Sequence, residues 1–430
     1  MKISVVGSGY VGLITATGLA SKDYDVVCID IDEGKIDMIN RAEPPFYEDK
    51  LAEALQIYVK QKANLKADPD YEALLNSDAT FICVNTSCNS GENADFSHVK
   101  QSTKRIGEVL SRKEGYHVVI TKSSVVPGTT EEIIIPLLEK YSGKRAGRDF
   151  GVAANPEFLQ EGRAIQCFLN SDRIIVGEYD QRSGDFMQDI YKGFGAPIMR
   201  TGIRTAEMIK FASNAFLATK ISFINEIGNL CKTLGIDVYQ VAEGMGRDPR
   251  IGRPFLDAGI GFGGSCLPKD LEALLYKYKK IGETSALLSA VSQVNKAQPL
   301  KIIEIARRRL GELRNKKIAV LGLTFKPDTD DIRNAPSIEI IRQLLNQGAQ
   351  IKAYDPRAMP KAQEVFSQSI QYGNSVQDTI EGYDYVLILT EWNEFKDESM
   401  YAGKMVLDGR RALDPEKAKR VCQYYEGVCW

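Results

Sequence analysis

Short apolar runs alternate with helical patterns through the first third of the chain. The runs at 2–6, 25–30, 79–84 and 117–120 predict strands, and the segment 95–110 has helical periodicity. Because strands that alternate with helices form open, mostly parallel sheets, we expect such a sheet here. Ligands of these sheets bind beyond the C-terminal strand ends. Two polar segments are therefore expected to face a cofactor, although ordinary turn chemistry explains them equally well: 85–87 and 122–124.

The rest of the chain repeats this pattern after two long helical stretches. Residues 205–234 and 284–311 have helical periodicity, and only Pro299 interrupts the second stretch. The strand-and-glycine theme returns at 315–326 without the glycine triplet, and a helix at 337–346 precedes further strands at 351–356, 385–389 and 405–408. We therefore predict an α/β fold with two Rossmann-like, doubly wound domains joined by a long central helix, divided as 1–200, 201–312 and 313–430. The second sheet is suited to a different nucleotide.

The first predicted turn carries a dinucleotide-binding pattern. Gly7, Gly9 and Gly12 follow the first strand and precede a helix, and Asp30 ends the second strand. At this spacing a pyrophosphate lies on the helix N-terminus, and the acid hydrogen-bonds the ribose 2′-hydroxyl. Because a carboxylate repels a 2′-phosphate, we expect NAD rather than NADP. The alternative is a tight strand–helix turn that binds no ligand.

A glycine-rich stretch at 259–270 combines a thiol, an ammonium and a carboxylate. Pro268 marks the start of a helix, so Cys266 is expected at a helix N-terminus with Lys269 close by. Both features lower the pKa of a cysteine, and the thiolate is the reactive form. The glycines at 261, 263 and 264 would let a ligand approach the backbone. The alternative is a buried structural cysteine.

The stretch 205–234 carries Lys210 and Asn214, which are four residues apart and share one helix face. Phe211, Ala215 and Phe216 surround them and predict a mostly buried helix. A buried amine and amide need polar partners, which an anionic or hydroxyl-rich ligand would supply. The alternative is that these two polar side chains face solvent along one side of an otherwise packed helix. A helix this long and apolar commonly joins domains or pairs with a second copy.

Two acids, Glu157 and Glu161, flank Phe158 and Leu159 and would share a face if this segment were helical. By themselves they indicate no more than a solvated surface.

Composition narrows the class of protein. The 430 residues are too many for one core, and 55 Lys and Arg nearly balance 57 Asp and Glu, so no basic surface for nucleic acid or an anionic membrane is expected. The sequence has neither an apolar run long enough for a membrane span nor a signal-peptide pattern, which predicts a cytoplasmic location. The 8 cysteines include no CxxC pair and there are only 2 histidines, so we expect reduced thiols, no metal, and proton transfer by Lys, Asp and Glu.

Several motifs together resemble the UDP-glucose/GDP-mannose dehydrogenase family over essentially the whole length. They are GSGYVG at 7–12, KSSVVPGTT at 122–130, NPEFLQEGRA at 155–164, the Lys210 and Asn214 pair, DPRIG at 248–252, GFGGSCLPKD at 261–270 and FKPDTDDIR at 325–333. Residues 250–252 and Glu161–Gly162 look most like the UDP-glucose branch. Two departures are Ser87, where proline is common, and Ser124, where threonine is common. Ser124 keeps the hydroxyl but loses β-branched stiffness.

The resemblance implies an NAD-dependent enzyme that oxidises the C6 alcohol of UDP-glucose to the carboxylate of UDP-glucuronate, using two NAD. Cys266 would be the nucleophile, holding the aldehyde as a thiohemiacetal and then a thioester. Lys210 would stabilise oxyanion character beside Asn214, and Asp270 would position or activate water. Glu157 would be a base for hydrolysis, and Ser124 completes the implied catalytic set.

Binding residues and partners are implied as well. The cofactor contacts would be Gly7, Gly9, Val11, Gly12, Asp30, Lys35, Thr86, Ser124, Glu161, Lys269 and Arg333. The nucleotide-sugar contacts would be Glu157, Phe158, Leu159, Lys210, Asn214, Arg250, Phe255, Leu256, Asp257, Ala258, Gly259, Gly263 and Lys326. Cations such as Lys326 and Arg250 suit a diphosphate, and Arg250 would reach the neighbouring subunit of a homodimer or higher oligomer formed through the central helix. The three predicted domains would bind NAD, carry the cysteine loop and dimerise, and bind the nucleotide sugar, respectively.

Other functions fit the same motifs. A GDP-mannose or N-acetylated UDP-hexosamine 6-dehydrogenase would carry the same cysteine loop. A single-oxidation β-hydroxyacid dehydrogenase would need no cysteine. A non-catalytic nucleotide-sugar sensor would keep the fold alone, and the intact set of Cys266, Lys210 and Asp270 argues against it.

Overall fold

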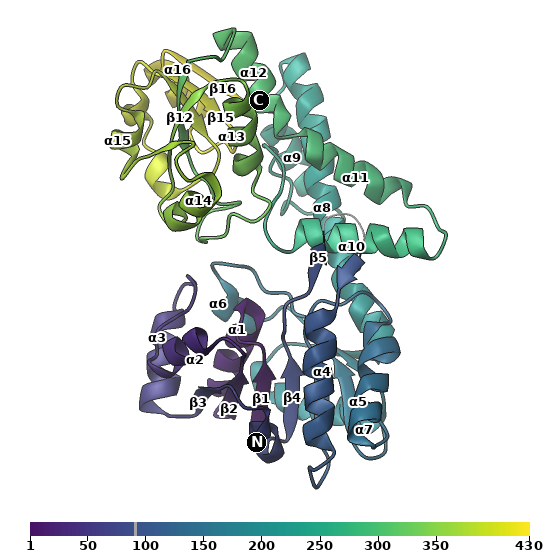
Figure 1. Ribbon diagram of the computed structural model, residues 1–430. Coiled ribbons are helices and arrows are strands. Elements are labelled where there is room, and N and C mark those ends of the chain that lie inside the picture. Colours follow the sequence, from purple (N-terminus) through teal and green to yellow (C-terminus); the bar gives the residue numbers. More distant parts are fainter. Residues whose placement is uncertain (90–92) are drawn as a thin grey trace. The chain divides into compact units, whose positions relative to one another are not determined.

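The computed structural model describes residues 1–89 and 93–430, which form two compact units, Met1–Ser213 and Asn214–Trp430 (Figure 1). The division falls inside one continuous helix, α8 (Ile203–Leu234). Each unit is built on a sheet of its own. The three-part domain division expected from the sequence stays a prediction.

The first unit contains an eight-stranded sheet with the order β10-β9-β8-β7-β4-β1-β2-β3. Neighbouring strands are parallel except β8 and β9, which confirms the mostly parallel sheet. The strands are β1 (Lys2–Val6), β2 (Asp25–Ile29), β3 (Leu65–Asp68), β4 (Ala79–Ile82), β7 (Val118–Thr121), β8 (Gly151–Ala154), β9 (Ile174–Glu178) and β10 (Ile198–Gly202). Strands β5 (Ser87–Asn89) and β6 (Asn93–Asp95) pair antiparallel in a separate two-stranded sheet.

Helices cover both faces of this sheet. Alternate residues of β1 point to opposite faces, so Val5 packs in one apolar cluster with α1 and Val6 packs in another with α4 and α5. The helical elements are α1 (Tyr10–Ala20), α2 (Glu33–Asn40), α3 (Leu51–Leu55), η1 (Gln56–Gln61), η2 (Tyr71–Asn76), α4 (Ser97–Leu110), η3 (Thr130–Ile134), α5 (Ile135–Ser142), α6 (Ala164–Leu169), α7 (Gln181–Tyr191) and η4 (Lys192–Phe194). The helix expected at 95–110 begins two residues late, because Asp95 ends β6 and its Oδ1 accepts the Ser97 N–H at 2.8 Å.

The second unit contains a six-stranded, fully parallel sheet with the order β13-β12-β11-β14-β15-β16. This is the doubly wound order that the repeated pattern predicts. The strands are β11 (Lys317–Leu321), β12 (Gln350–Tyr354), β13 (Gln371–Tyr372), β14 (Tyr385–Ile388), β15 (Met405–Asp408) and β16 (Tyr424–Gly427). The helical elements are α9 (Val238–Gly246), α10 (Leu267–Lys280), α11 (Ala286–Ala297), α12 (Leu300–Leu310), α13 (Pro336–Asn346), α14 (Met359–Phe366), α15 (Val376–Ile380), η5 (Asn393–Phe395), η6 (Glu398–Tyr401) and α16 (Pro415–Val421).

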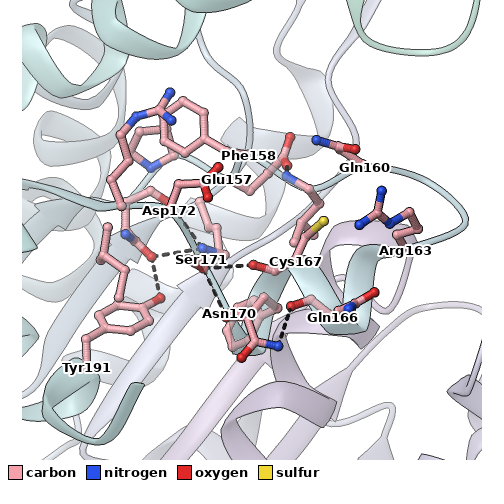
Figure 2. A pocket seen from close by; sticks show the side chains of 17 residues that line it. Glu157, Phe158, Gln160, Arg163, Gln166, Cys167, Asn170, Ser171, Asp172 and Tyr191 are labelled. Atoms are coloured by element: carbon pink, nitrogen blue, oxygen red, sulfur yellow. Dashed lines mark hydrogen bonds between the residues drawn. The ribbon is translucent and has the colours of Figure 1, made fainter. Parts of the chain in front are cut away.

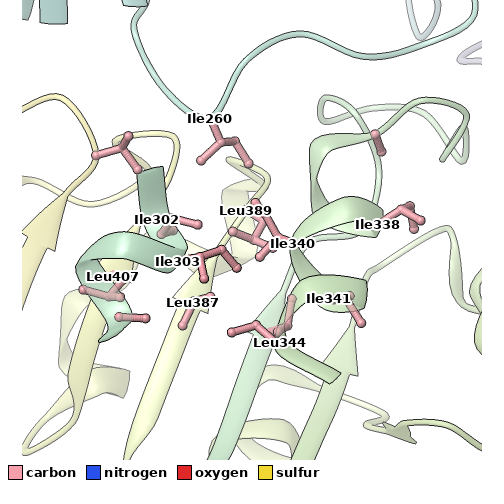
Figure 3. Packing of buried hydrophobic residues seen from close by; sticks show 14 of the residues in the cluster. Ile260, Ile302, Ile303, Ile338, Ile340, Ile341, Leu344, Leu387, Leu389 and Leu407 are labelled. Atoms are coloured by element: carbon pink, nitrogen blue, oxygen red, sulfur yellow. The ribbon is translucent and has the colours of Figure 1, made fainter. Parts of the chain in front are cut away.

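The core of the second unit anchors the loop that precedes Cys266. Ile302 and Ile303 of α12 lie in one cluster with Ile340 of α13 and Leu387 of β14 (Figure 3). Ile260, which belongs to the glycine-rich stretch, joins this cluster and is fully buried. The loop is thus fixed to packed hydrocarbon a few residues before the thiol.

Helix α8 is less buried than its apolar composition suggests. Phe211 and Ala215 are buried, but Phe216 is 64% exposed, so the expectation that it packs beside Asn214 is wrong. Residues two apart on a helix point in nearly opposite directions, which puts Phe216 on the face away from Asn214. Further exposed apolar side chains on this helix are Phe223, Leu230 and Leu234.

Candidate active site

The dinucleotide turn lies at the C-terminal end of β1. Helix α1 begins at Tyr10 with Gly9 as its N-cap. A Cβ at Gly12 would lie 1.7 Å from the carbonyl oxygen of Gly7, so close packing of the turn requires glycine there. At Gly9 a Cβ would meet no atom within 4 Å, which leaves the helix N-terminus open to an anion.

Asp30 stands at the end of β2 as an ionised acceptor. Its Oδ2 accepts hydrogen bonds from the backbone N–H and the hydroxyl of Ser8, both at 2.6 Å. Burial by itself would raise the pKa of Asp30, but the bonds from Ser8 and Asp32 outweigh it and the pKa is lowered. Nearby, the Lys35 ammonium lies 3.4 Å from Asp32. An open helix N-terminus and a carboxylate after the second strand fit an NAD pyrophosphate and ribose.

The two polar segments after β4 and β7 meet. The Thr86 hydroxyl donates to the carbonyl oxygen of Ser124 at 2.9 Å, and the Ser123 hydroxyl donates to that of Val84 at 2.6 Å. The side chain of Ser87 lies outside the part of the chain that the structure describes. The two loops therefore form one edge of the sheet beside the dinucleotide turn.

A buried ion pair joins Glu157 to Lys210. The Lys210 Nζ lies 2.9 Å from Glu157 Oε1, and both side chains are 4% exposed. Burial alone would raise the pKa of Glu157, but the charge and hydrogen bond of Lys210 outweigh it and the pKa is lowered. The interpretation of this acid as a solvated surface group is wrong, because residues 155–163 form a loop that tucks it inside, and helix α6 begins only at Ala164.

This loop forms the wall of a pocket of about 230 Å³ within the first unit (Figure 2). At its base the buried Lys122 ammonium donates to Asn155 Oδ1 at 2.9 Å, and the Tyr191 hydroxyl donates to the same oxygen at 2.5 Å. Burial lowers the pKa of Lys122 to about 8. The ring of Phe158 lies 4.2 Å from the Arg173 guanidinium. The sequence reading missed Asn155 as a partner for Lys122, although its place directly after β8 was a usable signal.

A second carboxylate network lies in the second unit. The Asn214 amide donates to Asp270 Oδ2 at 2.6 Å, and both side chains are buried. Asp270 is in the first turn of α10, where the Lys269 ammonium lies 3.7 Å from its Oδ1. Lys210 and Asn214 are one turn apart on α8, as their spacing predicts, and each holds a different acid.

Cys266 is the N-cap residue of α10, with Pro268 in the first turn as predicted. Its side chain is half-buried, and its sulfur lies 3.5 Å from the Ser265 hydroxyl. A Cβ at Gly263 would lie 2.3 Å from the carbonyl oxygen of Asn334, so the chain itself occupies the space expected for a ligand at that position. Packing is thus sufficient reason for this glycine, and a substrate contact by Gly263 stays a prediction.

The remaining predicted contacts differ in exposure. The Arg250 side chain is 87% exposed and pairs with Asp248 at 2.6 Å. Leu256 and Ala258 are buried, and a ligand contact by either residue stays a prediction. Three other predicted groups have partners within the second unit: Asp257 pairs with Arg253 at 2.5 Å, Arg333 pairs with Asp331 at 2.7 Å, and Lys326 lies 5.8 Å from the Phe325 ring centroid.

The Gly259 peptide is held on both sides. Asn225 Oδ1 accepts its N–H and the Gln298 amide donates to its carbonyl oxygen, each at 2.8 Å. Neither partner was predicted, because Asn225 on α8 and Gln298 at the C-cap of α11 are 34 and 39 residues from Gly259 in the sequence.

Residues 1–89 and 93–430 also include histidines, cysteines and acids outside these networks. That part of the chain contains no group of three or more His, Cys, Asp and Glu that could hold a metal ion, and the seven cysteines whose side chains are described form no disulfide. His117 is buried, which lowers its pKa to about 3. None of the helices described combines the length and the apolarity needed to cross a bilayer.

Comparison with known proteins identifies the family. The models of three domains of the UDP-glucose/GDP-mannose dehydrogenase family match the chain: the NAD binding domain at residues 1–195, the central domain at 204–297 and the UDP binding domain at 319–415. The UDP-glucose 6-dehydrogenase AglM of Haloferax volcanii is 41% identical over 96% of this chain and 97% of its own length.

Solved structures agree. A UDP-glucose dehydrogenase from the archaeon Pyrobaculum islandicum matches with a TM-score of 0.95 and 40% identity, covering 100% of this chain and 98% of that one. A UDP-D-ManNAc dehydrogenase from Pyrococcus horikoshii matches with a TM-score of 0.87 and 31% identity, covering 100% and 99%. The nucleotide turn, the two carboxylate networks and these matches place the chain in the UDP-glucose/GDP-mannose dehydrogenase family of NAD-dependent oxidoreductases.

Proposed function

We propose that the protein oxidises UDP-glucose at C6 to UDP-glucuronate, passing two hydrides to two NAD. The observation that carries the proposal is the buried Asn214–Asp270 hydrogen bond in the first turn of the helix that Cys266 caps, because it fixes an acid one turn from a half-buried thiol. The choice of UDP-glucose draws on the relatives of that name at about 40% identity over the whole chain.

Cys266 is the proposed nucleophile. NAD, when bound, accepts the hydride that leaves C6. The Cys266 sulfur then adds to the aldehyde carbon, whose oxygen takes up the thiol proton, to give a thiohemiacetal. Loss of that hydroxyl proton and of a second hydride from the carbon gives a thioester. Water attacks the thioester carbonyl, the C–S bond breaks, and the thiol and the carboxylate are released. Covalent capture keeps the aldehyde in place while the cofactor is exchanged.

Lys210 is proposed to stabilise the oxyanion, and Glu157 is proposed to accept a proton during hydrolysis. An ammonium in a buried site stabilises an oxyanion far better than the same group in water. The lowered pKa of Glu157 keeps it ionised near neutral pH, as a base for the hydrolytic step requires. Asp270 and Asn214 are proposed to position the water, and Ser124 and Thr86 to line the cofactor side.

A second sugar remains the competing substrate. GDP-mannose and N-acetylated UDP-hexosamines carry the same C6 alcohol, and the Pyrococcus horikoshii relative is named for UDP-D-ManNAc. That relative is 31% identical, against 40% for the UDP-glucose dehydrogenase of Pyrobaculum islandicum, which favours UDP-glucose.

The protein is further proposed to associate with a second copy through α8. Phe216, Phe223 and Leu230 repeat every seven residues, Leu234 follows one turn later, and their exposed fractions range from 46% to 64%. Such spacing makes one continuous apolar stripe, and contiguous exposed apolar surface marks an interaction site. A self-complementary helix face is best covered by its own copy. A cytoplasmic location stays a prediction.

A stoichiometric assay tests the reaction. Purified protein with NAD and a limiting sugar is expected to form about two NADH per UDP-glucose and none from GDP-mannose. Cys266→Ala is expected to lower acid formation at least about a hundredfold, since it removes the covalent route, whereas Cys422→Ala, a buried cysteine elsewhere in the second unit, is the matched control. A yield near one NADH per sugar, or an unimpaired Cys266→Ala, would contradict the thioester route. No NADH from any nucleotide sugar would support a sensor instead.

A further inference from the structure

Glu48 is a buried carboxylate that belongs to none of the motifs above. It lies in the connection between α2 and α3, and its side chain is 5% exposed. Three donors converge on its two oxygens. The Tyr10 hydroxyl and the Gly162 N–H reach Oε2 at 2.5 and 2.7 Å, and the Ala164 N–H reaches Oε1 at 2.6 Å.

These donors come from two functional segments. Tyr10 is the first residue of α1, directly after the dinucleotide glycines, and its ring packs on Phe46 with centroids 5.2 Å apart. Gly162 and Ala164 close the loop that carries Glu157 and lead into α6. One carboxylate thus bridges the cofactor turn and the pocket loop, from positions 114 and 116 residues before its two backbone donors.

Only a carboxylate satisfies this arrangement. Burial and the neighbouring Glu48 raise the pKa of Tyr10, so its hydroxyl stays protonated and donates. All three partners are donors, and a carboxylate is an acceptor at both oxygens. A glutamine of the same shape would turn its NH₂ group against the Ala164 N–H in one orientation and against the Gly162 N–H in the other. Neither orientation avoids a donor facing a donor.

We propose that Glu48 is a positioning residue that couples the order of the 156–164 loop to occupancy of the cofactor turn. Through Tyr10, any shift of the α1 N-terminus on NAD binding reaches the segment that holds Glu157 and Glu161. The proposal rests on the proposed function only for the identity of the sugar; the coupling to the cofactor stands on the NAD site alone.

Hydrogen exchange of the full-length protein with and without NADH tests the coupling. NADH is expected to slow exchange in the wild type both at residues 7–15 and at 156–169. In Glu48→Gln the slowing at 7–15 should remain, while that at 156–169 should fall to the part that a direct contact of the cofactor with Glu161 would supply. Tyr10→Phe keeps both backbone hydrogen bonds to Glu48 and should also weaken the NADH-dependent slowing at 156–169. This variant supplies the test if Glu48→Gln does not fold. Glu43→Gln, an exposed acid of the same connection, is the matched control. Unchanged slowing at 156–169 in Tyr10→Phe and in a folded Glu48→Gln would overturn the proposal.

The steady-state kinetics give a second test, because a purely structural role of Glu48 would leave kcat and KM unchanged. Glu48→Gln is expected to lower kcat/KM for UDP-glucose about tenfold, the effect of mispairing a buried charged acceptor. Adding Tyr10→Phe to it should cost little more, since both act through one carboxylate. Effects that multiply, or a lowered Tm with unchanged kcat and KM, would show a merely structural acid. If the wild type forms no NADH from UDP-glucose, the proposed function fails while the exchange experiment still decides the role of Glu48.

Discussion

Replacing Lys210 with methionine removes the cation from the buried pair while nearly preserving side-chain volume. The ammonium lies 2.9 Å from Glu157 Oε1, and both side chains are 4% exposed. Removing one partner of such a pair leaves an uncompensated buried charge, at a cost of about 3–5 kcal/mol. We expect about 3 kcal/mol near neutral pH, because Glu157 keeps the Leu159 N–H at 2.5 Å as a donor.

The pH dependence of this loss follows from the pKa of Glu157. In the wild type Lys210 lowers that pKa against the effect of burial, so the stabilisation is present above the unfolded-state value of about 4.3 and is lost as pH falls through the folded-state value. In Lys210→Met both contributions of Lys210 are gone, so burial, the largest effect, is expected to raise the pKa against the Leu159 N–H and the Lys122 charge that remain. The buried carboxyl then takes up a proton in mild acid, and the deficit relative to wild type shrinks.

Urea unfolding followed by circular dichroism at about pH 7 and about pH 4 measures the deficit directly. The Lys210→Met deficit should be clearly smaller at the lower pH, and adding Glu157→Gln should recover most of the stability at neutral pH without restoring activity. Lys104→Met breaks an exposed pair with Glu108 on α4 and is the matched control, for which little change is expected at either pH. Equal deficits at both pH values would refute the electrostatic account and indicate a packing defect.

Two further changes test other parts of the molecule. Phe223→Glu places a charge in the exposed apolar stripe of α8 and is expected to shift the sedimentation coefficient to that of a single chain, while Phe223→Leu should not; an unchanged coefficient would exclude α8 as the contact. Glu426 is bound by Lys232, Arg308 and Arg309, and although burial alone would raise its pKa, these contacts and Tyr424 lower it to about 2. Its stabilisation is therefore present above the unfolded-state pKa and is lost as pH falls toward about 2, so Glu426→Gln should cost about 2 kcal/mol at neutral pH after solvent screening, and almost nothing near pH 2. A deficit that does not depend on pH would argue against that network.

Features carried by neighbouring residues were predictable. The glycines at 7–12, the proline that opens α10 and the four-residue spacing of Lys210 and Asn214 each encode their local geometry, and the structure shows all of them. The doubly wound order of both sheets followed from strands alternating with helices. In each case the deciding interaction spans only a few residues of the chain.

The partners of the buried acids were not predictable in this way. Glu48 is of a residue type usually found at the surface, and its donors are 38, 114 and 116 positions away, so no neighbouring residue in the sequence indicates the bridge. The sequence indicated a solvated acid at Glu157. In the fold this side chain is buried against Lys210, which lies 53 residues later in the sequence. Periodicity also misplaced Phe216, because an apolar residue on a helix can face a partner copy as well as a core.

The amino-acid sequence alone thus determined the elements and the two nucleotide-type sheets and supplied the candidates for the reactive groups, since backbone propensity and apolar periodicity act over a few residues. Tertiary structure alone decided which acid pairs with which cation, at which glycine the chain itself occupies the space beside the Cα, and which helix face stays exposed. Those outcomes depend on long-range packing, where burial turns a weak surface charge into one that must have a partner.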